Sequence, residues 1–446
     1  MKVNNRVLAV GGAVAAALSG AYAQDRPNVL VIYTDDQGTL DVGCFGAPDL
    51  YTPNLDALAG RGVKLTQFYA APVSSASRTG FMTGQYSAHN GVTGIVKADG
   101  SDGLDDEKET IAERMRANGY RTACIGKWHC GSKPESLPNN QGFDYFWGFR
   151  GGCIDSYSHF FYWNGANRHD LWRNEREIFE AGEFFVESSV REIRNFILEQ
   201  DTDKPFFLYW APNIPHYPLQ PTEKWLDFYR DVPGPRSMYC AYISTFDEYV
   251  GEVTGFLESR GLLDNTIIIF QSDNGHSCES RTFGEGGYCG DYRGAKFSLF
   301  EGGIRVPAII SWPGHIPEGE SRDQMLANID WFPTIMELCG ADPEGTVIDG
   351  KSFVPVLKNA GAKSPHDVLF FDHGKKWAMR YGDWKLLSDP VDIFKNDERA
   401  TVEGLFLVNL AEDHTESTNL AGRYPEIVKK MLELRKGCPV YKPHVK

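Results

Sequence analysis

The sequence places a serine and an arginine about one helical turn apart, at Ser74 and Arg78. The apolar run 63–71 before them predicts a strand, and 75–82 predicts a short helix. A serine at such a turn lies beside unpaired N–H groups and the positive end of the helix dipole, which favour an anion. The pattern therefore indicates a nucleophile beside an anion site, although a serine-rich cap before an ordinary helix has the same composition.

Oxygen-bearing side chains follow two other apolar runs. Asp35 and Asp36 follow the run 28–33 with one residue between, and Asp273 and Asn274 follow the run 266–271 in the same way. Ligand sites in α/β sheets lie at the carboxyl ends of strands. Adjacent buried carboxylates are costly unless a cation is present, and oxygen donors suit a hard cation such as Ca²⁺ better than zinc. The alternative for the first pair is a solvated acidic turn.

Basic and titratable side chains end two further apolar runs. Lys127 and His129 follow the predicted strand 121–125, and side chains two apart on an extended chain point to one face. His216 lies between two prolines, which fix its backbone and carry no ladder hydrogen bonds. A surface-loop histidine is the alternative for His216. Lys127 and His129 would supply one fixed cation and one titratable imidazole to an anionic ester, although a lysine and a histidine two residues apart also occur by chance.

The elements that must position these side chains are predicted from apolar runs, caps and breakers. Buried parallel strands are continuous apolar runs, and short strands followed by a helix predict a small α+β unit. A stretch rich in glycine and proline, 340–365, is the predicted linker between the two parts. We expect strands at 28–33, 63–71, 121–125, 205–211, 266–271, 306–311, 368–371, 377–381, 384–387 and 405–409, and helices at 53–59, 75–82, 107–117, 238–260, 330–339 and 424–435.

These segments resemble the type I sulfatases of the alkaline phosphatase superfamily. The first motif is Ser74-x-Ala-x-Arg78, followed by T-G-Q-Y at 83–86. G-K-W-H-x-G at 126–131, P-H-x-P at 215–218 and K-x-x-x-F-E-G-G-x-R-V-P from Lys296 carry the rest of the resemblance. It extends from residue 28 to the end of the chain. One mild departure is a cysteine at 130, where the family usually has an apolar residue.

The resemblance implies an α/β fold with a large mixed central sheet sandwiched by helices, and a smaller C-terminal α+β subdomain. It also implies hydrolysis of a sulfate ester through formylglycine, an aldehyde formed after translation from the first residue of the motif. Here that residue is Ser74, which indicates the serine-type bacterial branch. The implied partners are a sulfated carbohydrate substrate and a maturation enzyme that generates formylglycine.

The resemblance further assigns roles to individual side chains. One hydroxyl of the hydrated aldehyde attacks sulfur, cations neutralise the sulfate oxygens, and His216 protonates or steadies the leaving sugar oxygen. His129 takes the proton of the remaining hydroxyl, so that the aldehyde re-forms and sulfate leaves. The implied catalytic residues are Ser74, Arg78, Lys127, His129, His216 and Lys296, and the implied calcium ligands are Asp35, Asp36, Ser74, Asp273 and Asn274.

The N-terminus predicts export. Basic residues, the apolar run 7–18 and Ala21-Tyr22-Ala23 are typical of a cleavable signal peptide at 1–23, for a secreted or periplasmic protein. The run is too short for a good membrane span, and no cysteine follows the cleavage site to carry a lipid anchor. We expect a catalytic domain at 24–345 and a C-terminal subdomain at 346–446, with a small antiparallel sheet and a helix.

Composition narrows the partners. The chain of 446 residues has a formal net charge of −15, so it repels nucleic acid and anionic membranes. A sulfated substrate would be repelled at long range as well, and a local positive pocket must reverse that field. The nine cysteines form no zinc-like pair. Export permits a bridge between Cys278 and Cys289, and buried thiols are the alternative.

Several other side chains are candidates for weaker roles. The aromatic segment 140–185 suits either a sugar-binding wall or ordinary loop packing. His276, His373 and Arg380 are candidate substrate contacts, while Glu301 and Arg305 are expected to form a structural pair at a glycine turn. The polar residues of the aromatic segment are Arg150, Asp155, His159, Arg168 and His169.

Two other functions remain compatible with the sequence. The first is a phosphomonoester or phosphonate ester hydrolase of the same superfamily, although a two-zinc site would need more Asp and His ligands than the chain offers at matching positions. The second is a binding protein for sulfated glycans in which Ser74 is never converted, so that the pocket exists without turnover.

Overall fold

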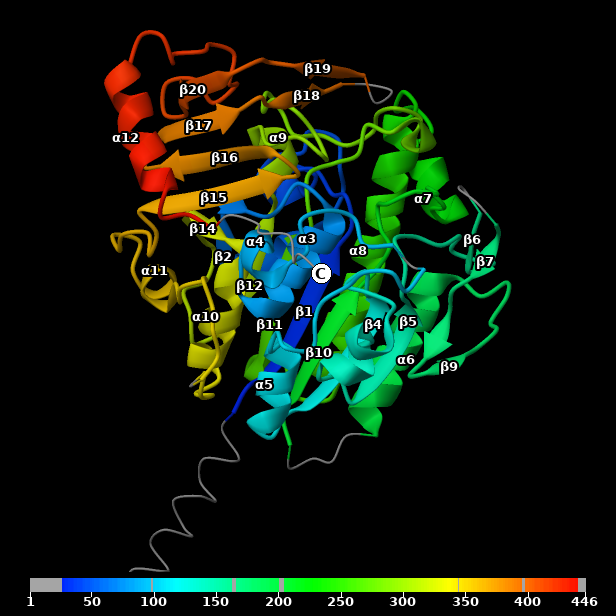
Figure 1. Cartoon of the computed structure of the whole chain (residues 1–446). Helices are drawn as coiled ribbons and strands as arrows, with labels where there is room; N and C mark the ends of the chain where they lie inside the picture. Colours follow the sequence, from blue (N-terminus) through cyan, green and yellow to red (C-terminus); the bar gives the residue numbers. More distant parts are fainter. Residues whose placement is uncertain are drawn as a thin grey trace, which may run out of the picture.

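A computed structural model describes residues 26–439, except 98, 163–165, 200–203, 344 and 395–397. The predicted signal peptide at 1–23 lies outside the described residues. Figure 1 shows a large sheet with helices on both faces and, beside it, a smaller sheet with one helix.

The large sheet has ten strands within the described residues, in the order β13-β2-β12-β11-β1-β10-β4-β5-β8-β9. The strands from β11 to β5 run parallel, and β12 and β8 are antiparallel to their neighbours in that group, so the sheet is mixed as predicted. Its members are β1 (Asn28–Thr34), β2 (Gly62–Leu65), β4 (Arg121–Lys127), β5 (Tyr145–Phe149), β8 (Trp172–Arg173), β9 (Arg176–Glu177), β10 (Phe206–Ala211), β11 (Thr266–Ser272), β12 (Ala308–Ser311) and β13 (Glu320–Arg322).

The alternation of side chains along β1 creates a hydrophobic core on each face of this sheet. Leu30 and Ile32 enter one core, whereas Val29, Val31 and Tyr33 enter the other. Because both faces are covered, the strand is a continuous apolar run. The first core is closed by α2 (Pro53–Gly60), α6 (Phe185–Leu198), α7 (Glu223–Phe228) and α8 (Arg236–Ser259), and the second by α3 (Ser74–Thr83), α5 (Ile111–Ala117), α10 (Trp331–Leu338) and α11 (Val354–Lys358).

The smaller sheet is antiparallel, in the order β15-β16-β17-β20. Its two faces enter different clusters, one of them with Met431 of the C-terminal helix and the other with Phe300 and Ile304 of the large body. Figure 1 shows the helix α12 along this sheet. The elements are β15 (Val368–His373), β16 (Lys376–Tyr381), β17 (Trp384–Ser388), β20 (Leu405–Asn409) and α12 (Pro425–Arg435).

Short elements complete the described fold. They form two-stranded ladders and single helical turns between the larger elements. They are β3 (Phe68–Tyr69), β6 (Phe160–Phe161), β7 (Arg168–His169), β14 (Leu326–Ala327), β18 (Val391–Ile393), β19 (Arg399–Thr401), α4 (Ser87–Asn90) and α9 (Glu301–Ile304).

Two predicted elements differ from the structure. The apolar run 63–71 is not one strand, because β2 pairs with β12 and β13 while β3 pairs with β14 in a separate ladder. The helix expected at 107–117 begins later, since Thr110 and Glu113 form a capping box that fixes its start. The 14-residue helix α6 was not predicted.

Two further features bear on predictions about the chain's organisation. Phe353 and Leu357 pack in a core of the large sheet, so the segment after residue 346 still packs against that sheet. The domain boundary at 345/346 stays a prediction.

No disulfide links the nine cysteines, all of which lie in the described residues. The bridge considered between Cys278 and Cys289 does not form, and the alternative of buried thiols holds for both side chains.

Candidate active site

Four neighbouring parallel strands, β11, β1, β10 and β4, end at one edge of the large sheet. Asp35 and Asp36 follow β1, and Asp273 follows β11. Lys127 is the last residue of β4, and β10 leads into the loop that carries His216. Side chains from distant parts of the sequence thus meet where α/β sheets place their ligand sites.

The helix α3 brings Ser74 to this edge as its first residue, after Val73 in extended conformation. Ser74 is 2% exposed, and its hydroxyl donates to Asp273 Oδ2 at 2.5 Å. One turn later, Arg78 donates through Nε to Ser74 Oγ at 3.0 Å and through Nη2 to Asp273 Oδ2 at 2.8 Å. A hydroxyl, a carboxylate and a guanidinium therefore contact one another in the interior.

Two lysines pair with the two aspartates after β1. Lys127 Nζ lies 2.8 and 2.7 Å from the carboxylate oxygens of Asp35, and Lys296 Nζ lies 2.8 Å from Asp36 Oδ2. Burial would raise the pKa of Asp35, but Lys127 and Arg78 hold it below its usual value. Burial raises the pKa of Asp36 to about 7, against the attraction of Lys296. The added cost of ionising Asp36 is one that a bound cation would relieve.

The residues expected to bind calcium offer oxygen atoms to a metal ion. The side-chain oxygen of Asn274 is buried and has no hydrogen-bond partner within the described residues, while its amide donates to Asp36 Oδ1 at 2.7 Å. Ligand atoms of Asp35, Asp36 and His216 lie within 4.8 Å of one another. Carboxylate oxygens together with an open amide oxygen fit a hard cation, so these residues fit the implied calcium ion.

His216 is held by its own loop. The loop is hydrogen-bonded to the start of the site, because the Asp35 N–H donates to the carbonyl of Ile214 at 3.0 Å. A carbonyl can only accept, so His216 Nδ1, 2.9 Å from the Tyr217 carbonyl oxygen, is the donor. His216 Nε2 lies 3.7 Å from Asp36 Oδ2. Burial and the positive charge of Lys296 lower the pKa of this histidine well below its usual value.

His129 lies just beyond the end of β4 and turns away from the strand path. Its φ of 54° is in the left-handed region, so it does not continue the predicted extended alternation with Lys127. The imidazole is buried, and its Nδ1 has no partner within the described residues. Burial, followed by the charges of Lys127 and Arg78, lowers its pKa well below the usual value. His129 is therefore a neutral ring that can accept a proton.

Lys296 lies on a loop whose backbone is hydrogen-bonded to two other segments near the site. Its N–H donates to the carbonyl of His276, and the next residue, Phe297, donates to the carbonyl of Pro72. Lys296 Nζ also lies 3.6 Å from Glu279 Oε2. The sequence did not single out Glu279, because only folding of the loop 275–296 brings it to the lysine.

Three weaker candidates lie outside this cluster. Arg380, predicted as a substrate contact, is 3% exposed and donates to Gln67 Oε1 at 2.8 Å, so it is occupied in the interior. His373 donates to the Phe297 carbonyl at 3.1 Å. His276 is buried, and its Nδ1 atom has no hydrogen-bond partner within the described residues.

The predicted pair of Glu301 and Arg305 does form, with 3.4 Å between Arg305 Nη1 and Glu301 Oε2. The proposed sugar wall divides into two groups. His159 is fully buried, and Asp155 accepts hydrogen bonds from its own loop, including Ser158 N at 2.7 Å. The other group lines a surface cavity and consists of Arg150, Arg168 and His169.

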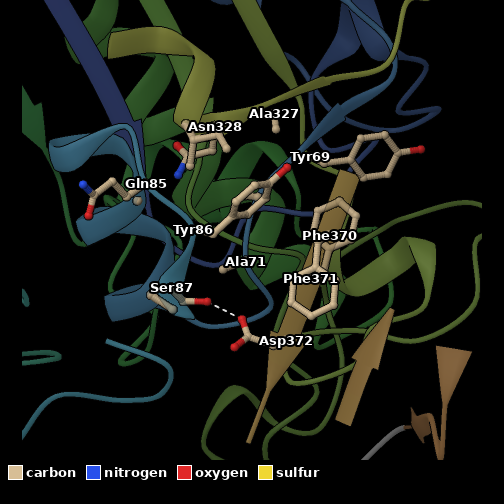
Figure 2. A pocket seen from close by; sticks show the side chains of 14 residues that line it. Tyr69, Ala71, Gln85, Tyr86, Ser87, Ala327, Asn328, Phe370, Phe371 and Asp372 are labelled. Carbon is tan, nitrogen blue, oxygen red and sulfur yellow. Dashed lines mark hydrogen bonds between the residues drawn. The ribbon is translucent and has the colours of Figure 1, made fainter. Parts of the chain in front are cut away.

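A small cavity of about 40 Å³ lies behind α3, between α4 and the smaller sheet. Figure 2 shows Tyr86, Phe370 and Phe371 around it, and the hydrogen bond from Ser87 to Asp372 beside them. None of the predicted catalytic or metal-binding residues lines it. It belongs to the junction between the two sheets.

Fold and site together define a class of enzyme, one that acts on an anionic ester with an alkaline phosphatase-like architecture. Residues 27–341 match the Sulfatase family, and the chain belongs to that family. It is therefore a sulfuric ester hydrolase. No helix in the described ranges has the length and apolar character needed to cross a membrane.

Individual relatives support the assignment along most of the chain. Human (Homo sapiens) arylsulfatase A is 32% identical, over 94% of this chain and 89% of that protein. The N-acetylgalactosamine-6-sulfatase of Canis lupus familiaris is 30% identical, over 83% of this chain and 73% of that protein. A crystal structure of Ps i-CgsB in complex with k-i-k-neocarrahexaose has a TM-score of 0.82 and 28% identity, over 92% of each chain.

Proposed function

We propose that this sulfatase removes a sulfate ester from a carbohydrate, using a formylglycine formed from Ser74 and a bound calcium ion. The observation that carries the proposal is the position of Ser74 Oγ, 2.5 Å from Asp273 Oδ2 and 3.0 Å from Arg78 Nε, among buried carboxylates. The choice of a carbohydrate substrate is supported by similarity to an N-acetylgalactosamine-6-sulfatase and to a protein whose structure is a complex with k-i-k-neocarrahexaose.

The charges of the site fit an anionic substrate. Once a bound cation favours ionised Asp36, Asp35, Asp36 and Asp273 carry three negative charges, and Glu279 beside Lys296 adds a fourth. Three buried cations face them, namely Lys127, Lys296 and Arg78. A divalent cation, when bound, polarises the sulfate oxygens and leaves the site with a net positive charge. Such a local field offsets the repulsion that a chain with a net charge of −15 exerts on a sulfated glycan.

The reaction that we propose transfers the sulfuryl group to a hydroxyl at position 74. A bond forms between that oxygen and sulfur, and the bond from sulfur to the sugar oxygen breaks. Arg78 orients the residue at position 74, and the lysines donate to the sulfate oxygens. The attacking hydroxyl passes its proton to a neighbouring carboxylate, such as Asp273, which already accepts the hydrogen bond of Ser74. An anionic ester bound beside His216 raises the pKa of the imidazole, so that Nε2 gains a proton and gives it to the leaving sugar oxygen. His129 takes the proton of the second hydroxyl, so that the aldehyde re-forms and sulfate departs.

The first test concerns Ser74. Ser74→Ala should abolish sulfate release and leave the fold intact, because the nucleophile is lost and little buried volume changes. Protein from a host that lacks serine-type maturation should be nearly inactive, whereas the Ser74 peptide of active protein should have lost two hydrogen atoms in mass spectrometry. Undiminished sulfate release by Ser74→Ala would contradict the mechanism. An unconverted Ser74 in protein from the native host, together with binding of a sulfated glycan without turnover, would favour the glycan-binding alternative.

The second test concerns the metal. Elemental analysis should find one calcium per chain, and chelation should remove activity and lower the melting temperature, because an ion that binds only the native state stabilises it by linkage. Ser158→Ala, a substitution in another loop, is the control. It should bind calcium and respond to chelation as the parent does. Zinc at two per chain would instead favour the phosphate or phosphonate ester hydrolase, since His216 lies beside Asp35 and Asp36.

The predicted signal peptide at 1–23 leads us to propose export to the periplasm or beyond the cell, where a sulfated glycan would be met. The predicted maturation enzyme would act on Ser74 before folding finishes, because the folded chain exposes only 2% of this residue. Conversion should therefore fail on the purified folded protein and succeed on the unfolded chain.

A further inference from the structure

A second cavity lies at the same edge of the large sheet, beyond the residues just described. Its volume is about 280 Å³, and Ser132, Arg150, Arg168 and Trp172 are among the residues that line it. Arg150 directly follows β5 and Trp172 belongs to β8, so the cavity lies outward from β4 in the strand order. Ser132 lies three residues after His129. The same loop therefore carries the His129 imidazole and forms part of the cavity wall.

The two arginines of this cavity have charges that no carboxylate neutralises directly. Neither forms an ion pair within the described part of the chain, and the Nε atom of each is buried without a hydrogen-bond partner there. Arg150 stacks 3.7 Å from the centroid of the Trp172 ring, and Arg168 lies 5.2 Å from that of Phe161. Arg150 Nη2 also donates to the Asn174 carbonyl at 3.4 Å, which leaves its other guanidinium donors for a ligand. Stacking fixes the guanidinium plane, so these donors can face an oxyanion.

The acidic groups nearby are already occupied. Asp170 is 3% exposed and accepts the backbone N–H groups of Arg150 and Gly151 at 3.1 and 2.8 Å. Asp99, another residue that lines the cavity, accepts a hydrogen bond from the backbone N–H of Ser101. The third basic side chain of the wall, His169, pairs with Glu177 at 2.9 Å. The arginines therefore remain the groups able to bind an added anion.

The separation between the two sites corresponds to neighbouring sugars. The backbone of His129 donates to the carbonyl of Arg150, so the two sites share a wall. Two inter-strand spacings separate β4, which ends in Lys127, from β8, and they amount to roughly 10 Å. A disaccharide spans such a distance, so a glycan with its sulfate beside Lys127 can place its next ring at the cavity.

We propose that this cavity binds a second anionic group of the substrate, on the sugar next to the one that loses its sulfate. The inference rests on the proposed action on carbohydrates and narrows the substrate class to glycans charged on adjacent residues. Arg150 and Arg168 donate to the oxygens of a sulfate or a carboxylate, both of which match the guanidinium fork.

Three synthetic disaccharides test this site and separate the two sources of charge. Each contains N-acetylgalactosamine 6-sulfate, joined to glucose, glucuronic acid or glucose 6-sulfate. Calorimetric titration of the Ser74→Ala chain in calcium-containing buffer measures binding without turnover. At least one of the two charged partners should bind about ten- to a hundred-fold more tightly than the glucose compound, as expected of hydrogen bonds between charged groups.

Variants decide whether the arginines cause this advantage. Arg150→Gln and Arg168→Gln should each remove most of it, and Arg168→Lys, which keeps the charge, should retain part of it. Arg176→Gln, at an exposed position of β9, should leave it unchanged. Thermal unfolding of every variant verifies that it is folded.

Equal affinities for the three compounds, including no binding of any, would overturn the proposal, as would an advantage that survives both Arg→Gln variants. Sulfate release by the converted chain is measured separately. Release without an arginine-dependent advantage contradicts the second site alone. An arginine-dependent advantage without release contradicts the proposed sulfatase function on these sugars and leaves the anion site in place.

Discussion

The residues of the site are buried charges that depend on one another. Asp273 accepts hydrogen bonds from the side chains of Ser74 and Arg78. Asp35 forms an ion pair with Lys127. These five side chains are almost completely buried. Removing one partner of a buried ion pair typically costs about 3–5 kcal/mol, because the other charge is left without compensation. Loss of activity in a charge variant here must therefore be accompanied by a measurement of folding.

The two histidines allow a sharper prediction because neither forms a short ion pair. An acid acting on the leaving oxygen matters most when that oxygen is a poor leaving group, as a sugar alkoxide is. His216→Ala should therefore lose far more rate on a sulfated sugar than on an activated aryl sulfate. His129→Ala should instead trap the sulfated intermediate, seen as a gain of one SO₃ group on the position-74 peptide. Each rate loss should be about a hundred- to ten-thousand-fold.

Both variants are assayed on both substrates, with His89→Ala as the control, since that side chain is 49% exposed. The control should behave as the parent. Equal losses on the two substrates for His216→Ala, together with no adduct for His129→Ala, would show that the two roles are wrongly assigned.

At the scale of elements, the close approach of strand backbones holds the site's edge together. Gly126 of β4 has φ 117°, and a Cβ atom there would lie 2.0 Å from the carbonyl oxygen of Ala211 on β10. A Cβ atom on Gly148 of β5 would likewise lie 1.9 Å from the carbonyl oxygen of Gly126. Lys127 directly follows Gly126, so the spacing of these strands determines where its ammonium lies.

Gly126→Ala should destabilise the protein by about 2–5 kcal/mol, since a left-handed backbone and overpacking add together. Sulfate release should fall as well, because Lys127 moves with the strand. Gly119→Ala is the matched control: its φ is 85°, yet nothing lies within 4 Å of the added Cβ. The control should cost only about 1–2 kcal/mol. Equal shifts in urea midpoint for the two variants would rule out strand crowding as the cause.

The elements also explain what the sequence could predict. The strands β1, β10 and β11 were predicted within one residue at each end, because strands buried on both faces are continuous apolar runs. The motifs likewise supplied the charged residues that meet at the sheet edge. Local pattern did not predict β5, β8 or α6, which lie in or beside an aromatic segment without clear periodicity. Nor could it pair Lys127 with Asp35, since that contact depends on the order of strands in the sheet.

At the scale of the whole molecule, a buried ionic cluster joins the small sheet to the large body. Lys385 of β17 lies 2.9 Å from both Glu301 Oε1 and Glu416 Oε1. The Glu301 N–H donates to Glu416 Oε2 at 2.6 Å. The same body carries the Lys296 loop, where Ser298 donates to the carbonyl of Val391 at 2.6 Å. Val391 belongs to the β18-β19 ladder, so packing of the C-terminal elements also holds a loop of the active site.

This cluster gives stability a pH dependence with a defined sign. Burial raises the pKa of Glu416 from 4.5 to about 7, although Lys385 opposes the rise. Between these two values the native state holds a proton that the unfolded chain has released, so the free energy of unfolding decreases as pH rises. The decrease from this group is at most about 3 kcal/mol. Glu416→Gln resembles the protonated form and should lack it.

The measurement is the melting temperature of parent and variant from pH 5 to pH 8, with calcium present so that the metal site stays loaded. Near pH 5 the two proteins should melt together, because Glu416 is protonated in the native parent. At pH 8 the variant should melt at a higher temperature, since it has no carboxylate to ionise beside Glu301. Glu412→Gln, at an exposed position, should follow the parent throughout. If the melting temperatures of Glu416→Gln and the parent stayed equal from pH 5 to pH 8, Glu416 would not change its protonation state in this range. The proposed pH dependence of stability would then be wrong.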